Sequence, residues 1–320
     1  MYEIVRVPEK DTRKKVLFVR FSSLGDVILT TGVIREFKRQ FPDILCDVFT
    51  SNDFASVFSG LDFINEVITI NRKEGIKSYA KVVQERVNGY DYIVDLHSNL
   101  RTFLLKFMSA SKFLRYKKDS SERRNFVKKR IKTERIGMHV VLKYAESLIP
   151  LGFTMPTLEE LRPVVFSDKK EQAGIVINPF ASKPTKQWDK FPLLAERLVS
   201  EGHKVTVIGQ GDFPDIYGVK LLTGKTSLNE MFDVLAENTT LITTDSGPLH
   251  AGVALNKKVI AIFGSTTSDF GFAPDFQGCS IVEKNNLSCR PCHVHGQDVC
   301  PEGHFECMKN ISVDDVLRLV

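Results

Sequence analysis

The stretch VLFVRFSSLGDVILTTGVIREFKRQFP, residues 16 to 42, decides the fold class. Its first six residues, Val16 to Phe21, are mostly β-branched or aromatic and predict a buried strand. Two serines and a glycine follow, and from Leu24 the apolar residues recur at helical spacing. A buried strand that turns directly into an amphipathic helix is the repeating unit of a parallel sheet covered by helices.

The same alternation continues along the chain. Strands are predicted over residues 45–50, 66–70 and 92–97, with a helix over 77–87 between the last two. A polar, turn-rich stretch from Thr154 to Gly174 interrupts the pattern, which then begins again with further strands and helices. We therefore predict an α/β protein of two Rossmann-like, doubly wound domains, residues 1–165 and 166–320. A ligand cleft is expected between them, at the carboxyl ends of the strands.

Length and composition agree with two domains. The chain has 320 residues, which suits two domains of about 150 each. With 42% hydrophobic and 26% charged residues it has the composition of a globular protein, not of a disordered or fibrous one. No run approaches the ~18 apolar residues of a membrane span. The N-terminal residues are polar and mixed in charge, unlike a secretory signal, so a cytoplasmic location is expected.

The positive charge is concentrated in one segment. The formal net charge of the chain is +5. Residues 112–135 contain eleven Lys or Arg and three acidic residues, a local charge of +8, so the rest of the chain sums to −3. Such a segment is either a solvated helix face or a surface for an anionic partner. RNA would suit the charge, but no nucleic-acid-binding motif surrounds it, so nucleic acid is not expected as a partner.

Three loops after predicted strands carry candidate functional groups. In the first, Asp26 begins a helix, where it either caps the helix or acts as a general base. In the second, Asp245 and Ser246 precede Pro248, which suits a first helical turn, and the helix N-terminus would attract a diphosphate. Asp245 alone could be a cap, and His250 an ordinary helix-face histidine. In the third, residues 179–188 offer a hydroxyl and two lysines.

Taken together, the motifs of this chain resemble glycosyltransferase family 9, the ADP-heptose:lipopolysaccharide heptosyltransferases. Within it, the cysteine-rich tail most resembles the heptosyltransferase II branch. The resemblance rests on RFSSLGDVILTTGVIREFKRQFP, DYIVDLHSNLRT, NPFASKPTKQW, LTGKTSL, TTDSGPLHAGVALNKKVIAIFGSTT, LSCRPCHVHGQDVCPEGHFECM and ISVDDVL.

The resemblance implies a GT-B architecture, in which the N-terminal domain binds the acceptor and the C-terminal domain binds the nucleotide sugar. It implies inverting transfer of heptose from ADP-heptose to a Kdo/heptose–lipid A inner core, with no divalent metal and no cofactor. It also implies a cytoplasmic enzyme at the inner face of the inner membrane, with residues 112–135 in contact with the anionic surface. The aromatic residues of this segment, Phe113, Tyr116 and Phe126, would insert at that interface.

The family's functional residues map onto matching positions. Asp26 would be the general base and Lys186 would stabilise the leaving diphosphate. The donor would also be bound by Ser182, Asp215 (or Asp212 in its place), Thr226, Asp245, Ser246, Gly247 and His250, and the acceptor by Ser22, Ser23, Gly25 and Arg101.

The cysteines leave one further possibility open. Cys289, Cys292, Cys300 and Cys307 crowd near the end of the chain, with three histidines close by. These are enough ligands for a structural zinc, although the spacing is not that of a standard zinc knuckle. The resemblance accounts for the cysteines without a metal.

Two other functions compete with heptosyl transfer. A UDP-sugar 2-epimerase shares the two-domain architecture, but it would need more catalytic acids and histidines than Asp26 and His250 supply. A basic membrane- or nucleic-acid-binding protein with an inactive cleft would use residues 112–135. A transferase of the same family with another sugar or acceptor is the nearest alternative.

Overall fold

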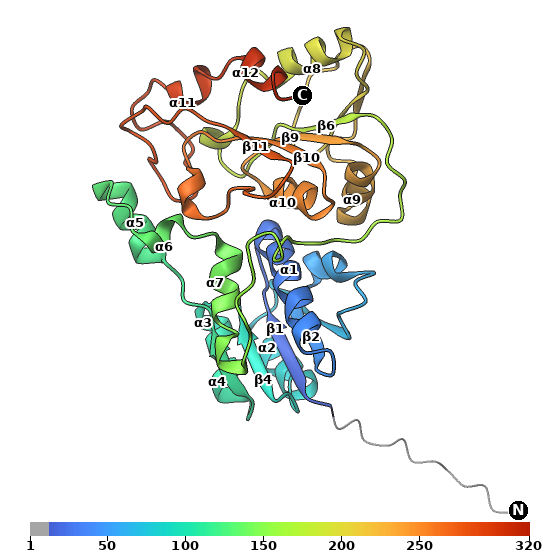
Figure 1. The fold of residues 1–320 in the computed structure, drawn as a ribbon, viewed down its shortest axis with the longest axis vertical. Coiled ribbons are helices and arrows are strands. Elements are labelled where there is room, and N and C mark those ends of the chain that lie inside the picture. The colour runs from blue at the N-terminus through green and yellow to red at the C-terminus, as the bar shows by residue number, and fades with distance from the viewer. Residues whose placement is uncertain (1–12) are drawn as a thin grey trace, which may run out of the picture.

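The N-terminal half is built on a five-stranded parallel sheet with the order β3-β2-β1-β4-β5 (Figure 1). The computed structural model describes residues 13–320. Helices cover both faces of the sheet, so the central strand is apolar and almost wholly buried. The strands are β1 (Lys15–Val19), β2 (Leu45–Ser51), β3 (Glu66–Ile70), β4 (Tyr92–Asp95) and β5 (Lys112–Arg115).

The helices of this half follow the strands in turn. A short 3-10 helix, Asn52–Phe58, follows β2, and another, Ile149–Leu151, ends the half. The α-helices are α1 (Leu24–Gln40), α2 (Ile76–Arg86), α3 (Leu100–Phe103), α4 (Leu105–Met108), α5 (Ser120–Lys129), α6 (Glu134–Gly137) and α7 (Val140–Glu146).

The C-terminal half repeats the architecture with a six-stranded parallel sheet, ordered β11-β10-β9-β6-β7-β8. Its strands are β6 (Ile175–Asn178), β7 (Val205–Val207), β8 (Val219–Leu221), β9 (Thr240–Thr244), β10 (Lys258–Ile262) and β11 (Cys279–Val282). Its helices are α8 (Phe191–Ser200), α9 (Leu228–Ala236), α10 (Gly247–Ala254), α11 (Glu306–Lys309) and α12 (Val313–Leu317), with 3-10 turns at Pro184–Lys186 and Ser268–Phe270.

An extended segment joins the two halves. Between residues 152 and 174 the chain has no helix or strand and runs along the junction of the domains (Figure 1). The boundary expected at residues 165 and 166 falls within this segment. Arg162 ties it to the second half, since its Nη2 donates to the carbonyl of Gln277 at 2.6 Å.

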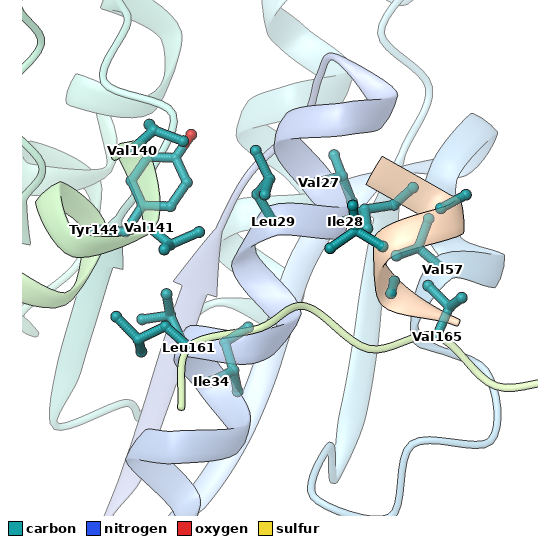
Figure 2. Packing of buried hydrophobic residues seen from close by; sticks show 14 of the residues in the cluster. Val27, Ile28, Leu29, Ile34, Val57, Val140, Val141, Tyr144, Leu161 and Val165 are labelled. Carbon is teal, nitrogen blue, oxygen red and sulfur yellow. The ribbon is translucent and has the colours of Figure 1, made fainter. Parts of the chain in front are cut away.

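Helix α1 is the centre of the core. One side of it packs against Val141 and Tyr144 of α7, and another against Val57 and the linker residue Val165 (Figure 2). The same buried cluster continues into α10 of the second half, so this apolar cluster spans both domains, and each domain has a further cluster of its own. Helices α1 and α10 approach each other closely at Gly25. A Cβ atom at this position would lie 2.3 Å from the ring of His250, so only glycine fits there.

Most predicted elements are found, with shifted ends. The strand predicted over Val16 to Phe21 is β1, which ends two residues earlier, at Val19. Residues 112–135 form strand β5 and two helices, so the basic segment is more than one solvated helix face. Tyr116 and Phe126 are buried, which rules out their insertion into a membrane, whereas Ile131 is 61% exposed.

Two expectations concern the N-terminus and membrane spans. The expectation that the polar N-terminus is not a secretory signal concerns mainly residues 1–12. These lie outside the described residues. Within residues 13–320, no helix has the length and apolar character needed to cross a membrane.

Candidate functional site

A cleft of about 680 Å³ lies between the two domains. Both halves contribute to its walls, including α1, α5 and α7 on one side and α10 on the other. The predicted site residues that line it are Ser23, Gly25, Asp26, Ser182, Lys186, Asp245, Ser246, Gly247 and His250.

The sheet topology explains why these residues meet. In the first sheet the strand order reverses between β1 and β4, and in the second between β6 and β9. At such a reversal the loops at the carboxyl ends of the strands diverge to opposite faces and leave a crevice. Asp26 follows β1, Lys186 follows β6 and Asp245 follows β9, so the three loops open into one cleft.

Asp26 is held in place by four donors. Its Oδ2 accepts from the backbone N–H and the Oγ of Ser23, at 3.1 and 2.7 Å, so it makes the helix-start contact predicted as one alternative. Its Oδ1 pairs with Arg20 Nη2 at 2.6 Å and accepts from the Tyr144 hydroxyl at 3.2 Å. Burial opposes ionisation, but the charge of Arg20 and the Ser23 bonds prevail and lower the pKa of Asp26 to about 2. The carboxylate is therefore ionised at neutral pH.

Arg20 is a site residue that the sequence did not reveal. It is 6% exposed and comes directly after β1, where the strand pattern conceals it. Besides the ion pair with Asp26, its Nε donates to the carbonyl of Ser22 and its Nη1 to that of Leu96. Arg20 thus fixes both the Ser22–Ser23 loop and the carboxylate of Asp26.

Lys186 and Asp245 face each other on the opposite wall. Lys186 Nζ lies 2.8 Å from Asp245 Oδ2, and the same oxygen accepts from the Thr266 hydroxyl at 2.9 Å. Asp245 is not the N-cap of α10, since Ser246 occupies that position. The capping alternative for Asp245 is thus wrong, and its carboxylate instead orients the Lys186 ammonium.

The N-terminus of α10 opens into the cleft. Ser246 and Gly247 line the cavity, and the Ser246 side chain makes no capping bond to the helix. The Ser246 Oγ accepts instead from Asn178 Nδ2 at 2.9 Å. Backbone N–H groups and the positive end of the helix dipole are therefore available to an anion.

His250 lies between the two walls. It is 6% exposed on α10 and contacts the backbone of Gly25 in α1. Burial lowers the pKa of its imidazole to about 4, against the opposing influence of Asp245 and Asp26. His250 is therefore neutral at pH 7, and the charged side chains that line the cleft are aspartates, lysines and arginines.

The neutral state of His250 makes stability depend on pH. The unfolded chain takes up a proton near pH 6.5 and the folded chain only near pH 4, so this stabilisation is present above pH 6.5 and is lost as the pH falls toward 4. At pH 5 the loss is on the order of 2 kcal/mol. Urea unfolding at pH 7 and pH 5 should show a smaller pH effect in His250→Gln than in wild type. Equal pH effects would contradict the assignment.

Four predicted residues lie outside the lining of this cleft. Ser22 precedes Ser23, and its carbonyl is bonded to Arg20. Arg101 sits on α3, with its guanidinium 5.7 Å from the Tyr79 ring and within 3.4 Å of the Arg72 carbonyl. Asp215 is exposed, in the loop between β7 and β8, and Thr226 is half-buried, in the loop that follows β8.

The cleft also contains cations that the motifs did not indicate. Lys118, Arg123 and Arg124 from the basic segment line it, together with His293 and His295 from the cysteine-rich tail. Arg123 is buried and three residues before the buried Phe126 on α5. In the sequence, Arg123 stands in a run of charged residues, and no local pattern separates it from its exposed neighbours.

The cysteine-rich tail contains the residues considered as ligands of a structural zinc. The sulfur of Cys289 lies 3.9 Å from Nε2 of His304, and Cys292 Sγ contacts the carbonyl of Ser265. Burial raises the pKa of Cys307 to about 11, which favours the protonated thiol. Among residues 13–320, no three His, Cys, Asp or Glu side chains are grouped as metal ligands.

Comparison with known proteins identifies relatives along most of the chain. The model of glycosyltransferase family 9 (heptosyltransferase) matches residues 80–299. Lipooligosaccharide heptosyltransferase 2 of Campylobacter jejuni is 26% identical, over 92% of this chain and 93% of that protein. Lipopolysaccharide heptosyltransferase 3 of Escherichia coli is also 26% identical, over 77% of this chain and 82% of its own length.

Solved structures agree on the architecture. The structure of E. coli ADP-heptose lps heptosyltransferase II superposes with a TM-score of 0.70 at 20% identity, covering 95% of this chain and 97% of that one. The two parallel sheets, the cleft between them and this similarity confirm the predicted GT-B fold of two Rossmann-like domains.

Proposed function

Because this chain belongs to glycosyltransferase family 9, the heptosyltransferases, we propose that it moves a heptosyl group from ADP-heptose to the lipopolysaccharide inner core, with inversion and without a divalent metal. The proposal rests on one observation, which is that a group able to act as a base and groups able to bind a diphosphate line opposite walls of one cleft. An ionised carboxylate, Asp26, lies on the N-terminal wall, and a lysine and a free helix N-terminus lie on the C-terminal wall.

The proposed reaction is a single displacement. An acceptor hydroxyl oxygen forms a bond to the anomeric carbon while the bond from that carbon to the phosphate oxygen breaks. The hydroxyl proton goes to Asp26, and ADP leaves with the bonding electrons. One base and no protein nucleophile are required, so the configuration of the anomeric carbon inverts.

The leaving diphosphate gains negative charge as it departs. We assign its stabilisation to Lys186 and to the backbone of Ser246 and Gly247 at the start of α10, with Ser182 beside them. In metal-dependent transferases a divalent cation provides this positive charge. Because the groups named above supply it here, we propose that the enzyme needs no metal.

The other predicted roles follow the same arrangement. Asp245 and His250 would contact the donor sugar and phosphates, and Asp215 and Thr226, in the loops before and after β8, would contact the nucleoside. On the N-terminal side, Ser22, Ser23, Gly25 and Arg101 would bind the acceptor. We assign acceptor binding to residues 1–165 and donor binding to residues 166–320.

The proposal is tested with a panel of nucleotide sugars and truncated Kdo–lipid A as acceptor, with and without EDTA. We expect transfer from ADP-heptose at a rate that EDTA does not change, and an inverted anomeric linkage in the product by NMR. Transfer only from another sugar would assign a different donor. No transfer, with no nucleotide sugar raising the melting temperature, would favour a binding protein with an inactive cleft.

We further propose that residues 112–135 hold the enzyme at an anionic membrane surface on the cytoplasmic side. Lys128, Lys129 and Ile131 are close in the sequence and exposed, Ile131 at 61%. Exposed lysines next to an exposed apolar side chain in the sequence suit an interface of anionic headgroups.

Replacing Lys128 and Lys129 together by glutamine should weaken binding to anionic vesicles by about 30-fold, since each lysine near such a surface contributes about 1 kcal/mol. Vesicle co-sedimentation measures the effect, with neutral phosphatidylcholine vesicles as the control. Turnover on a deacylated, water-soluble acceptor should stay the same. Equal loss on the lipid and soluble acceptors would indicate a structural role for these lysines.

A further inference from the structure

The carboxylate of Asp26, the proposed base, is saturated with hydrogen bonds. A carboxylate offers about four lone-pair positions, two on each oxygen. Its Oδ1 pairs with Arg20 Nη2 at 2.6 Å and accepts from the Tyr144 hydroxyl at 3.2 Å. Its Oδ2 accepts from the backbone N–H and the Oγ of Ser23, at 3.1 and 2.7 Å. A sugar hydroxyl can therefore donate to Asp26 directly only if one of these donors leaves.

The two donors to Oδ1 are buried and held by other contacts. Arg20 also donates to the carbonyls of Ser22 and Leu96. Tyr144 is fully buried, and its ring packs edge-on against Tyr116 with the ring centres 4.9 Å apart. Releasing either donor would leave a buried polar group without its partner, which destabilises the fold. Oδ1 thus stays occupied, and Oδ2 is the oxygen that receives a proton.

The hydroxyl of Ser23 differs from the other donors to Asp26. Ser23 is exposed and lines the cleft. A hydroxyl has one proton to donate and two lone pairs that accept. Even when the capping-box contact from the backbone N–H of Asp26 is counted, one lone pair of Ser23 is left. Ser23 can therefore accept from a hydroxyl in the cleft while it donates to Asp26.

We propose that Ser23 is a catalytic residue that relays the acceptor proton to Asp26. The acceptor hydroxyl donates to Ser23 Oγ, and the Ser23 hydroxyl donates to Asp26 Oδ2. As the acceptor oxygen bonds to the anomeric carbon, its proton moves to Ser23 Oγ and the original serine proton moves to Oδ2. Ser23 ends neutral with one proton, and ADP leaves with the bonding electrons. This inference rests on the proposed function, in which Asp26 is the base.

The relay uses the arrangement that is already present. The 2.7 Å bond from Ser23 Oγ to Asp26 Oδ2 has the length of a strong, charge-assisted O–H···O⁻ bond. After the transfer the protonated Oδ2 donates back along the same line, so no side chain has to move. Direct transfer would first require this bond to break and the serine hydroxyl to rotate away. A preorganised route avoids that reorganisation.

The test is the single-turnover rate with ADP-heptose and deacylated Kdo–lipid A, a soluble acceptor. Ser23→Ala should lower this rate about 10- to 100-fold, less than the loss of the base itself, because Asp26 is still present. Its carboxylate also keeps three of its four donors, so its position is retained. Ser23→Thr, which restores a hydroxyl, should recover most of the rate.

Two further variants separate the relay from a structural role. Ser23 is the N-cap of α1, and alanine is a poor N-cap whereas glycine is a good one. Ser23→Gly therefore removes the hydroxyl with little loss of helix stability, and it should be as slow as Ser23→Ala. Ser120→Ala is the matched control, because Ser120 is also an exposed serine that lines the cleft. Its rate should equal that of wild type.

The number of protons in motion gives an independent readout. In mixtures of H2O and D2O, a relay moves two protons in one step, so the wild-type rate should fall along a curve as the D2O fraction rises. With one proton in motion, the rate should fall along a straight line, and we expect this in Ser23→Ala and Ser23→Gly. A side chain with only a structural role would not change the shape of this plot.

Three results would overturn the relay. One is a rate in Ser23→Ala and Ser23→Gly that equals or exceeds the wild-type rate, since Asp26 would then accept the proton directly. Another is a loss in Ser23→Ala that Ser23→Gly does not share, which would assign Ser23 to helix capping alone. The third is a straight-line plot in wild type. Failure of the proposed function looks different, because wild type itself would then transfer no heptose, and the relay would fall with it.

Discussion

Replacing Lys186 by methionine is expected to lower kcat by about 10²- to 10³-fold with ADP-heptose as donor. Removal of one preorganised donor to a developing oxyanion has an effect of this size. The lysine stands 2.8 Å from Asp245 and is largely buried, so no solvent-exposed cation can replace it by a simple rotamer change. Affinity for ADP should fall as well, because the lysine also attracts the ground-state diphosphate.

Lys183→Met is the matched control for this substitution. Lys183 lies in the same loop, but it is half-buried, pairs with Asp298 and does not line the cleft. Its kinetic constants should equal those of wild type. Steady-state kinetics and ADP calorimetry on both variants check the prediction, and a Lys186→Met enzyme with wild-type kcat would contradict the assignment of Lys186 to the leaving group.

The convergence of the three loops could be predicted from the sequence. A strand followed at once by a small, polar loop and a helix occurs before Asp26 and before His250, and parallel topology places all such loops at one edge of a sheet. Which loops face each other follows from the strand order, and the two reversals are beside β1 and β6. Local pattern and global topology agree at these positions.

Arg20 and Arg123 could not be identified in the same way. In the sequence, Arg20 looks like one more residue of the predicted strand. Whether its charged side chain is buried depends on contacts with residues as far along the chain as Leu96 and Tyr144. Arg123 stands in a run where nearly every residue is charged, so composition does not distinguish the buried arginine from exposed neighbours such as Lys128. Both positions are set by tertiary contacts.

Asp26→Asn is expected to reduce kcat by about 10³-fold, within the range of general-base effects, while affinity for ADP stays within twofold. Asparagine keeps the size of the side chain and can still accept the Ser23 bonds, but it cannot take a proton. It also leaves Arg20 without its carboxylate, so some loss of stability is expected. Melting temperature and ADP binding, measured on the same sample, separate this loss from the catalytic one.

The low pKa of Asp26, about 2, bears on how such a base works. An acceptor hydroxyl is far too weak an acid to lose its proton to this carboxylate before reaction. As its oxygen bonds to the anomeric carbon, however, that proton becomes strongly acidic, and a weak base suffices at that stage. The rate should therefore show no loss from protonation of Asp26 between pH 7 and pH 5. A limb of the kcat profile near pH 6 that is absent in Asp26→Asn, or normal turnover in this variant, would contradict the assignment.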